Sequence, residues 1–131
     1  MIGFDFKFID ELKKVSEAAD KAVGRNLFKS AGKIRRVAVG SITRSPDASA
    51  PGTPPHTRRG DIRRAILFDV DRSKRNAVVG PRYSVVGPAA AVQEFGEEYY
   101  GVQYPERPFM GPALDEVAPD FAAGFSGSIG N

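Results

Sequence analysis

The sequence of 131 residues has no cysteine and only one histidine, His56. Without cysteine the chain has no disulfide and no thiolate metal ligand, and one histidine alone argues against a transition-metal centre, so we expect neither a metal nor a cofactor. No apolar run approaches the roughly 20 residues that a membrane-spanning helix needs. Charged residues interrupt the apolar N-terminal stretch, which argues against a signal peptide. We therefore expect a protein that is made and used in the cytoplasm, or in a particle assembled there.

The sequence also lacks the usual patterns of a catalytic site. Neither of the two common glycine-rich phosphate-binding patterns, GxGxxG and GxxxxGK[ST], is present. His56 lies in a proline-rich segment, a poor place to hold a general base in position. The acidic residues Glu94, Glu97 and Glu98 are clustered, but nothing in the sequence places another carboxylate opposite them. The sequence therefore predicts a protein that is not an enzyme.

The charges are distributed unevenly along a chain whose length suits one domain spanning residues 1–131. Residues 1–82 hold 18 of the 19 Lys and Arg and 9 of the 16 acidic residues, a net charge of +9. Residues 83–131 hold one Arg and seven acidic residues, a net charge of −6. Such a chain can bind nucleic acid, attract neighbouring copies of itself, or simply present an uneven solvated surface.

Two periodic segments open the chain. Apolar residues alternate over Ile2–Phe8, which predicts a half-buried strand. Apolar residues then recur every three or four positions, which predicts one long amphipathic helix over about Asp10–Val39. The cationic end of this segment, residues 33–39, is also compatible with a separate short strand.

Residues 41–60 contain four Pro and two Gly together with several Ser and Thr. We expect no packed helix or strand there, but a protruding loop that docks on a partner and whose order depends on assembly. The residues expected to make that contact are Pro54, Pro55, Arg58 and Arg59.

A β-hairpin is predicted next, with strands over residues 65–70 and 76–80, after a helical turn near residues 61–66. Residues 83–86 are expected to extend its second strand. The charged tip carries Arg72, Lys74 and Arg75, which we expect to contact DNA or a protein partner.

Residues 88–95 predict a short helix, with proline at its first position and Gly96 just beyond its end. An aromatic, loop-like stretch with Tyr99, Tyr100 and Tyr104 follows. These tyrosines fit a core and a subunit interface equally well, because tyrosine suits contacts that are only half dry.

Three further elements are predicted near the C-terminus. Residues 107–110 are expected to form a short edge strand, where proline is tolerated. Helical spacing covers about Pro112–Phe125, although Pro119 argues for a break. The glycine- and serine-rich residues 124–131 are expected to form a flexible tail.

The order of several short motifs resembles one known family, and the resemblance covers Ile2 to about Ala118. A strand and a long N-terminal helix precede a Pro/Gly loop that leads into a Gly-x-hydrophobic-Arg-x-x-Ile element. A hairpin ending in Val-Gly-Pro, a Glu-Phe-Gly element and an Arg-Pro-Phe-hydrophobic-x-Pro-Ala-Leu element follow. Here these motifs are Pro51–Pro55, Gly60–Ile66, Val79–Pro81, Glu94–Gly96 and Arg107–Leu114. In this order they resemble the small head–tail joining proteins of long-tailed bacteriophages, the neck or tail-completion family that includes minor tail proteins of lambda-like phages and prophages.

The resemblance implies an α+β fold in which a long N-terminal amphipathic helix and a C-terminal helix pack on an antiparallel sheet. It also implies a structural virion protein that forms a homo-oligomeric ring, six-fold or a multiple, at the head–tail junction. Its partners would be the portal or head-closure connector and the tail tube or tail terminator, with non-specific contact to genomic DNA in the channel and no membrane. The residues expected at the subunit or ring interface are Glu94, Phe95, Tyr99, Tyr100, Arg107 and Phe109. An ion pair between Arg107 and an acid such as Glu94 would fix the C-terminal helix on the sheet; the alternative is a solvated Arg107 at the surface.

The alternative is a small basic protein that binds nucleic acid without sequence specificity. Arg58, Arg59, Arg63 and Arg64 add to the basic residues of the hairpin tip, but no zinc finger, helix-turn-helix or RNA-recognition motif accompanies them.

Overall fold

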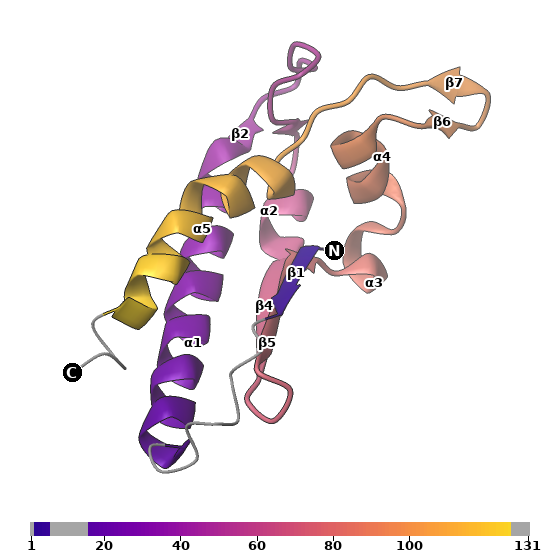
Figure 1. The fold of residues 1–131 in the computed structure, drawn as a ribbon. Coiled ribbons are helices and arrows are strands. Elements are labelled where there is room, and N and C mark those ends of the chain that lie inside the picture. The colour runs from indigo at the N-terminus through magenta and orange to yellow at the C-terminus, as the bar shows by residue number, and fades with distance from the viewer. Residues whose placement is uncertain (1, 6–15, 127–131) are drawn as a thin grey trace.

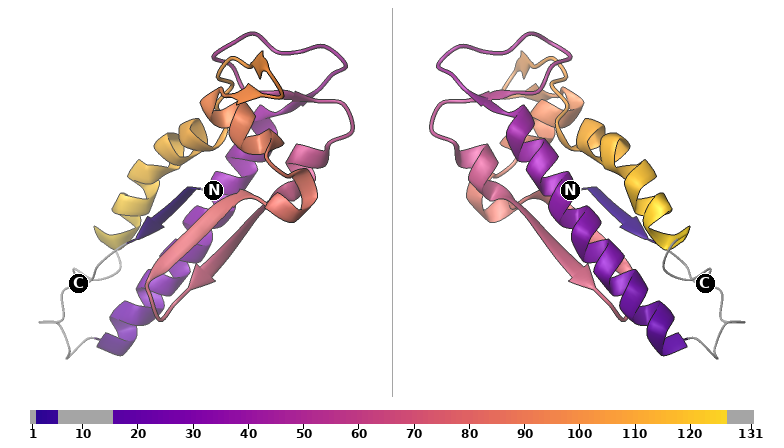
Figure 2. Two further views of the ribbon diagram at one scale, coloured as in Figure 1. Left: turned by 90° about the vertical axis from the view of Figure 1, so that its right-hand side faces the viewer. Right: turned by 90° about the vertical axis from the view of Figure 1, so that its left-hand side faces the viewer.

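The computed structural model describes residues 2–5 and 16–126 and shows an α+β fold in which helices α1 (Ser16–Ser41) and α5 (Met110–Ser126) pack with an antiparallel sheet (Figure 1). This confirms the expected fold class. The two long helices lie side by side, and the sheet packs against α1 in both orientations of Figure 2.

Helix α1 is the central element of the core. Its 26 residues span about 39 Å. The apolar residues whose spacing predicts the helix face inward, because a spacing of three or four places them on one side: Val23, Leu27, Ala31 and Ile34 are all buried, and the buried Ala38 continues their row. The alternative of a separate strand over residues 33–39 is wrong, since Ile34 and Ala38 continue the buried stripe. The predicted residues 10–15 of this helix lie outside the described part of the chain.

The main sheet has the strand order β1–β5–β4, with both pairs antiparallel. Strand β4 (Ile66–Asp71) and strand β5 (Asn76–Pro81) form the predicted hairpin, and Phe68 pairs with Val79 in its register. Strand β1 (Ile2–Asp5) is the N-terminal part of the predicted strand, whose residues 6–8 lie outside the described part. Side chains on one side of the hairpin, including Ile66 and Val79, are buried and join the core with α1.

Helix α5 runs through Pro119 without a break, so the predicted interruption is wrong. Proline removes one helical N–H and leaves the carbonyl of Asp115 without its usual partner. Both residues are exposed, so water can satisfy that carbonyl. The buried side of the helix, with Ala113 and Val117, anchors it on α1.

The C-terminal half of α5 is fastened to α1 by polar contacts. The side-chain amide of Asn26 donates a hydrogen bond to the carbonyl oxygen of Phe121 over 2.7 Å, and Lys33 forms an ion pair with Asp120. The helix continues to Ser126, so the predicted flexible tail begins too early. Residues 127–131 of that prediction lie outside the described part.

Three short helices connect these elements. Helix α2 (Asp61–Ala65) is the predicted helical turn. Helix α4 (Ala89–Phe95) is the predicted short helix, with Pro88 at its N-terminus and Gly96 at its C-terminus. Helix α3 (Tyr83–Val86) replaces the predicted extension of the hairpin strand, because the backbone N–H groups of Val85 and Val86 both donate to the carbonyl oxygen of Arg82.

The prediction of an edge strand over residues 107–110 is also wrong. The backbone N–H of Arg107 donates to the carbonyl oxygen of Gln93 over 2.6 Å, and α5 begins at Met110. The preceding aromatic stretch forms a small hairpin from β6 (Glu98–Tyr99) and β7 (Val102–Gln103). We call residues 97–104 the arm, because in Figure 1 this hairpin projects from the body of the molecule.

The prediction that residues 41–60 contain no strand is wrong, because two short strands pair at the base of the proline-rich loop. Strand β2 (Thr43–Arg44) pairs in parallel with β3 (His56–Thr57), which closes the loop at its base. The loop reaches back to the chain near the arm, where the backbone N–H of Gly52 donates to the carbonyl oxygen of Glu106 over 2.7 Å. The loop still projects at one end of the molecule (Figure 1).

Candidate interaction surface

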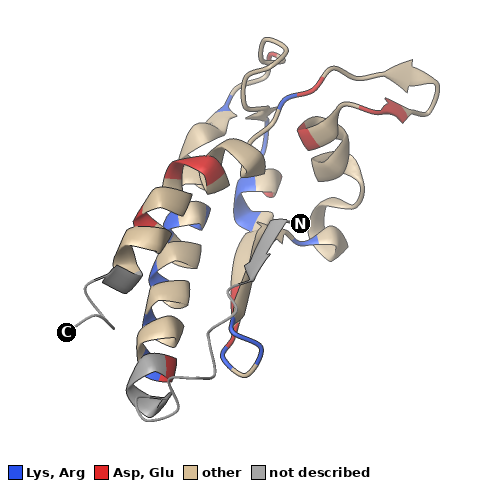
Figure 3. Ribbon diagram, viewed as in Figure 1, with Lys and Arg blue, Asp and Glu red and all other residues tan. Residues whose placement is uncertain are grey.

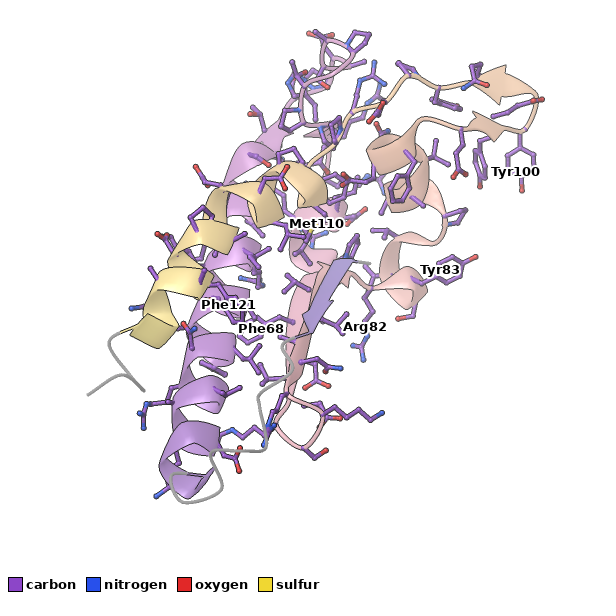
Figure 4. All side chains as sticks on the ribbon, in the orientation of Figure 1. Phe68, Arg82, Tyr83, Tyr100, Met110 and Phe121 are labelled. Atoms are coloured by element: carbon purple, nitrogen blue, oxygen red, sulfur yellow. The ribbon has the colours of Figure 1, made fainter. Side chains whose placement is uncertain are left out.

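Large apolar side chains are exposed together on one side of the molecule, around α3, the end of α4 and the arm. Tyr83 is 72% exposed, Phe95 60% and Tyr100 89%. In Figure 4 Tyr83 and Tyr100 lie on the same side of the molecule, away from α1 and α5. We call the exposed set the aromatic surface; its members are Tyr83, Phe95, Tyr99, Tyr100 and Val102.

The tip of the arm is a tight turn with an unusual residue. Tyr100 and Gly101 connect β6 to β7, and both have positive φ, 48° and 77°. This is the combination of a type I′ turn, which favours Asn followed by Gly. A bulky aromatic residue at positive φ costs free energy, so the local backbone does not account for tyrosine at this position.

The tyrosines of the arm interact with one another. The rings of Tyr99 and Tyr100 meet edge to face, with centroids 4.5 Å apart. Partial desolvation raises the pKa of Tyr99, and the nearby Tyr100, Tyr83 and Tyr104 act in the same direction. The sequence left open whether the three tyrosines belong to the core or to an interface. Tyr99 and Tyr100 are exposed and so do not belong to the core, whereas Tyr104 is half-buried.

An apolar hollow of about 170 Å³ lies beside the aromatic surface. Tyr83 and Phe95 form part of its rim, and Phe109 and Met110 from the start of α5 also line it. The remaining lining residues are mostly small: Pro81, Gly87, Ala90, Ala91 and Glu94. The aromatic surface is therefore uneven, with both projecting rings and a recess.

Glu94 is buried within the chain, where it binds the start of α5. Its Oε1 accepts hydrogen bonds from the backbone N–H groups of Phe109 over 3.1 Å and Met110 over 2.7 Å, and its Oε2 accepts one from Gly111 over 3.2 Å. The carboxylate thus satisfies amides that a helix N-terminus leaves unpaired, and its charge is favourable at that end of the helix dipole. Glu94 was predicted at a subunit interface, but the residue is only 8% exposed and its carboxylate is used within the chain, so it has little surface to offer a neighbouring subunit.

Two further residues of the predicted interface have internal roles. Phe109 is only 1% exposed and belongs to the core. Arg107 is half-buried, and its Nε donates to the carbonyl oxygen of Ser49 over 2.9 Å. The predicted ion pair between Arg107 and Glu94 is wrong, because backbone amides occupy the carboxylate and the loop carbonyl occupies the guanidinium. Phe95, Tyr99 and Tyr100 are the predicted interface residues that the structure leaves exposed.

The predicted docking residues of the proline-rich loop are also partly buried and partly exposed. Pro55 is buried and Pro54 half-buried, so both support the loop from inside. Arg58 and Arg59 are exposed and remain available to a partner. His56 uses its Nδ1 in a 2.8 Å hydrogen bond with the carbonyl oxygen of Asp47, which holds two parts of the loop together.

The tip of the β4–β5 hairpin is held by a carboxylate. Asp71 accepts hydrogen bonds from the hydroxyl of Ser73 over 2.6 Å and from the backbone N–H of Lys74 over 3.1 Å. These bonds, with that to Ser73 the larger cause, lower the pKa of Asp71. Of the predicted contact residues, Arg72 and Lys74 are exposed, whereas Arg75 forms an ion pair with Asp20 over 2.9 Å.

Helix α1 carries a set of exposed cations that our sequence analysis missed. Lys21, Arg25, Lys29 and Arg36 are exposed along the side of α1 that faces away from the core, and none forms an ion pair with a residue in the described ranges 2–5 and 16–126. Figure 3 shows the blue of Lys and Arg repeated along this helix. We call these four residues with Phe28, which is 59% exposed, the basic face. Their spacing of about four residues was the available signal, because it places side chains on one side of a helix.

The described part of the chain contains no group of three or more His, Cys, Asp or Glu placed to hold a metal ion. Within the same part, no helix is long and apolar enough to cross a membrane. Comparisons with protein-family models, with curated proteins and with solved structures found no match.

Proposed function

We propose that this chain is a structural virion protein that forms a homo-oligomeric ring at the head–tail junction of a long-tailed bacteriophage. The observation that carries the proposal is the aromatic surface, which is exposed in a single copy of the chain. The ring, its expected six-fold or multiple symmetry and its neighbours, a portal-side connector and the tail tube or tail terminator, follow from the motif order described above.

The chemistry of the aromatic surface suits a contact between proteins. Tyrosine and phenylalanine are enriched at interfaces, because their rings bury a large area while the tyrosine hydroxyl stays hydrated. The cost of exposing these rings is recovered when another chain covers them. Tyr100 adds to this argument, because it occupies a positive-φ turn position that favours Asn. A strained residue of this kind is often found where its side chain has a function.

The shape of the molecule also favours assembly through extensions. The arm and the proline-rich loop both project from the body formed by α1, α5 and the sheet (Figures 1 and 2). Projecting segments reach neighbours that a compact surface does not, so they suit a ring that also binds rings above and below it.

Sedimentation velocity of the purified chain over a wide concentration range, with electron microscopy of the largest species, tests the proposal. We expect rings, alone or with a neck partner, and weaker association in Tyr83→Gln with Phe95→Gln. Leu67→Thr is the matched control, because Leu67 is an exposed apolar residue, 43% exposed, on the sheet and outside the aromatic surface. A chain that stays monomeric at every concentration and with every neck partner would contradict the proposal.

A small nucleic-acid-binding protein is the second candidate, and the exposed cations of the basic face favour it. Non-specific binding through phosphates loses affinity steeply with salt, with a slope close to the number of phosphates contacted. A monomeric chain that binds duplex DNA with such a slope would support this candidate in place of the ring.

A further inference from the structure

We propose that the arm of one copy docks on the basic face of the next copy. The inference rests on the proposed ring and specifies its contact, in which two different surfaces of the same chain meet. Such a head-to-tail contact is the kind that generates rings and filaments.

The arm carries exposed negative charge. Glu97 and Glu98 in the arm and Glu106 at its base are exposed. None of them forms an ion pair with another residue of the described part of the chain. Together with Tyr99 and Tyr100, they make the arm an acidic and aromatic element that requires a cationic surface with some apolar area.

The basic face has those properties. Lys21 and Arg36 lie 15 positions apart on α1, a distance of about 22 Å along the helix. The exposed ring of Phe28 lies between them in the sequence and packs edge to face on Phe68, with centroids 5.3 Å apart. A ring held in place among cations offers an apolar contact to tyrosine, and the cations can also contact tyrosine faces.

The two surfaces cannot meet within one copy. In Figure 1 the arm projects at the upper right of the molecule, whereas most of α1 runs down the opposite, left side. Opposite placement lets each copy use its arm on one neighbour and its basic face on the other. Contacts of this kind continue from subunit to subunit until the ring closes.

Nucleic acid is the competing partner for the basic face. Phosphates would pair with its cations, but they would leave Phe28 exposed and the acidic arm without a partner. A second copy accounts for both surfaces at once, and for this reason we favour it.

Charge reversal tests the contact. One variant combines Arg25→Glu with Lys29→Glu, and the other combines Glu97→Lys with Glu98→Lys. We expect each variant alone to self-associate at least about tenfold more weakly than the wild-type chain in sedimentation velocity, because like charges then meet. An equimolar mixture is expected to regain association, because each kind of surface, original or reversed, again finds its opposite.

Matched controls separate this contact from a general effect of charge. Asp115→Lys with Glu116→Lys makes the same change on the exposed side of α5, and Arg58→Glu with Arg59→Glu makes it on the proline-rich loop. Both are expected to associate like the wild-type chain. Equal weakening in the controls, or a mixture that stays dissociated, would overturn the inference.

The absence of cysteine allows a second, direct test. Chains with Tyr100→Cys mixed with chains carrying Lys29→Cys are expected to form a covalent heterodimer under mild oxidation. Tyr100→Cys mixed with Asp115→Cys is expected to give none above the level of random collision.

The outcomes distinguish this inference from the ring itself. A wild-type chain that forms rings while the charge-reversed variants do so equally well would refute the arm contact and leave the ring standing. A wild-type chain that never associates would refute both. If Arg25→Glu with Lys29→Glu lowers the affinity for a DNA duplex and leaves association unchanged, the basic face binds nucleic acid and the inference is wrong.

Discussion

Glu94 Oε1 accepts a hydrogen bond from the backbone N–H of Met110 over 2.7 Å, across 16 residues of sequence. This contact joins the Glu-Phe-Gly element to the Arg-Pro-Phe-x-x-Pro-Ala-Leu element, the two motifs that are most specific in the sequence. The end of α4 and the start of α5 are thereby fixed to each other. The arm is the chain between them, so the same bond determines where the arm leaves the body.

Replacing Glu94 should destabilise the whole fold. Glu94→Ala leaves three amides at the start of α5 without their acceptor, and we expect the free energy of unfolding to fall by about 2–4 kcal/mol. Glu94→Gln keeps one carbonyl acceptor and should lose less, about 1–2 kcal/mol. Urea denaturation followed by circular dichroism measures both. Glu97→Ala, at an exposed position three residues away, should have no measurable effect on stability.

Tyr100→Asn should separate stability from association. Asparagine adopts positive φ more easily than tyrosine, so we expect the free energy of unfolding to stay the same or to rise by up to about 1 kcal/mol. Loss of an exposed ring should at the same time weaken self-association. Thermal denaturation and sedimentation velocity on the same sample make the comparison. A variant that associates as strongly as the wild-type chain would remove Tyr100 from the proposed contact.

Gly96 occupies a position that no larger residue fits. Its φ is 63°, and a Cβ added there would lie 2.7 Å from the backbone nitrogen of Glu106. Gly96→Ala should therefore cost about 2 kcal/mol or more, from the backbone conformation and from displacement of the Pro105–Glu106 backbone together. Gly101→Ala is the control, since Gly101 also has positive φ but a Cβ there meets nothing within 4 Å. Equal losses in the two variants would show that close packing at Gly96 is unimportant.

The hairpin tip should loosen in acid. The hydroxyl of Ser73 and the backbone N–H of Lys74 hold the pKa of Asp71 below its usual range. Because the folded-state pKa lies below that of the unfolded chain, ionised Asp71 stabilises the tip at neutral pH, and this stabilisation is lost as the pH falls through the folded-state pKa. We expect the amide signal of Lys74 to shift in nuclear magnetic resonance spectra recorded below about pH 4.

Asp71→Asn should abolish that shift, whereas Asp69→Asn, two residues away on the same strand, should retain it. A Lys74 signal that moves equally in both variants would assign the transition to another group.

The elements predicted correctly are those whose pattern is local. The alternation of Ile66 to Val70 and of Ala77 and Val79 marks the hairpin, and the stripe from Val23 to Ala38 marks α1, because each strand or helix imposes its own period on the sequence. Gly96 was also readable, since a helix often ends at a residue with positive φ.

The residues placed wrongly depend on parts of the chain far apart in sequence. Glu94 looks like a surface residue until the start of α5 is brought against it, and an ion pair with Arg107 was the simpler assumption. Residues 83–86 have strand-forming valines, but their backbone closes into a helical turn after Arg82. The basic face was not predicted, because the prediction of α1 rested on the spacing of its apolar residues and not on the spacing of its Lys and Arg residues.

Residues 105–107 connect the arm with the proline-rich loop. They continue from the arm, and they hold the proline-rich loop through the bonds from Gly52 to Glu106 and from Arg107 to Ser49. A displacement of the arm therefore reaches the loop through a few backbone and guanidinium bonds, without passing through the hydrophobic interior. Because of these bonds, we expect a partner that binds one of the two projecting segments to shift the position of the other.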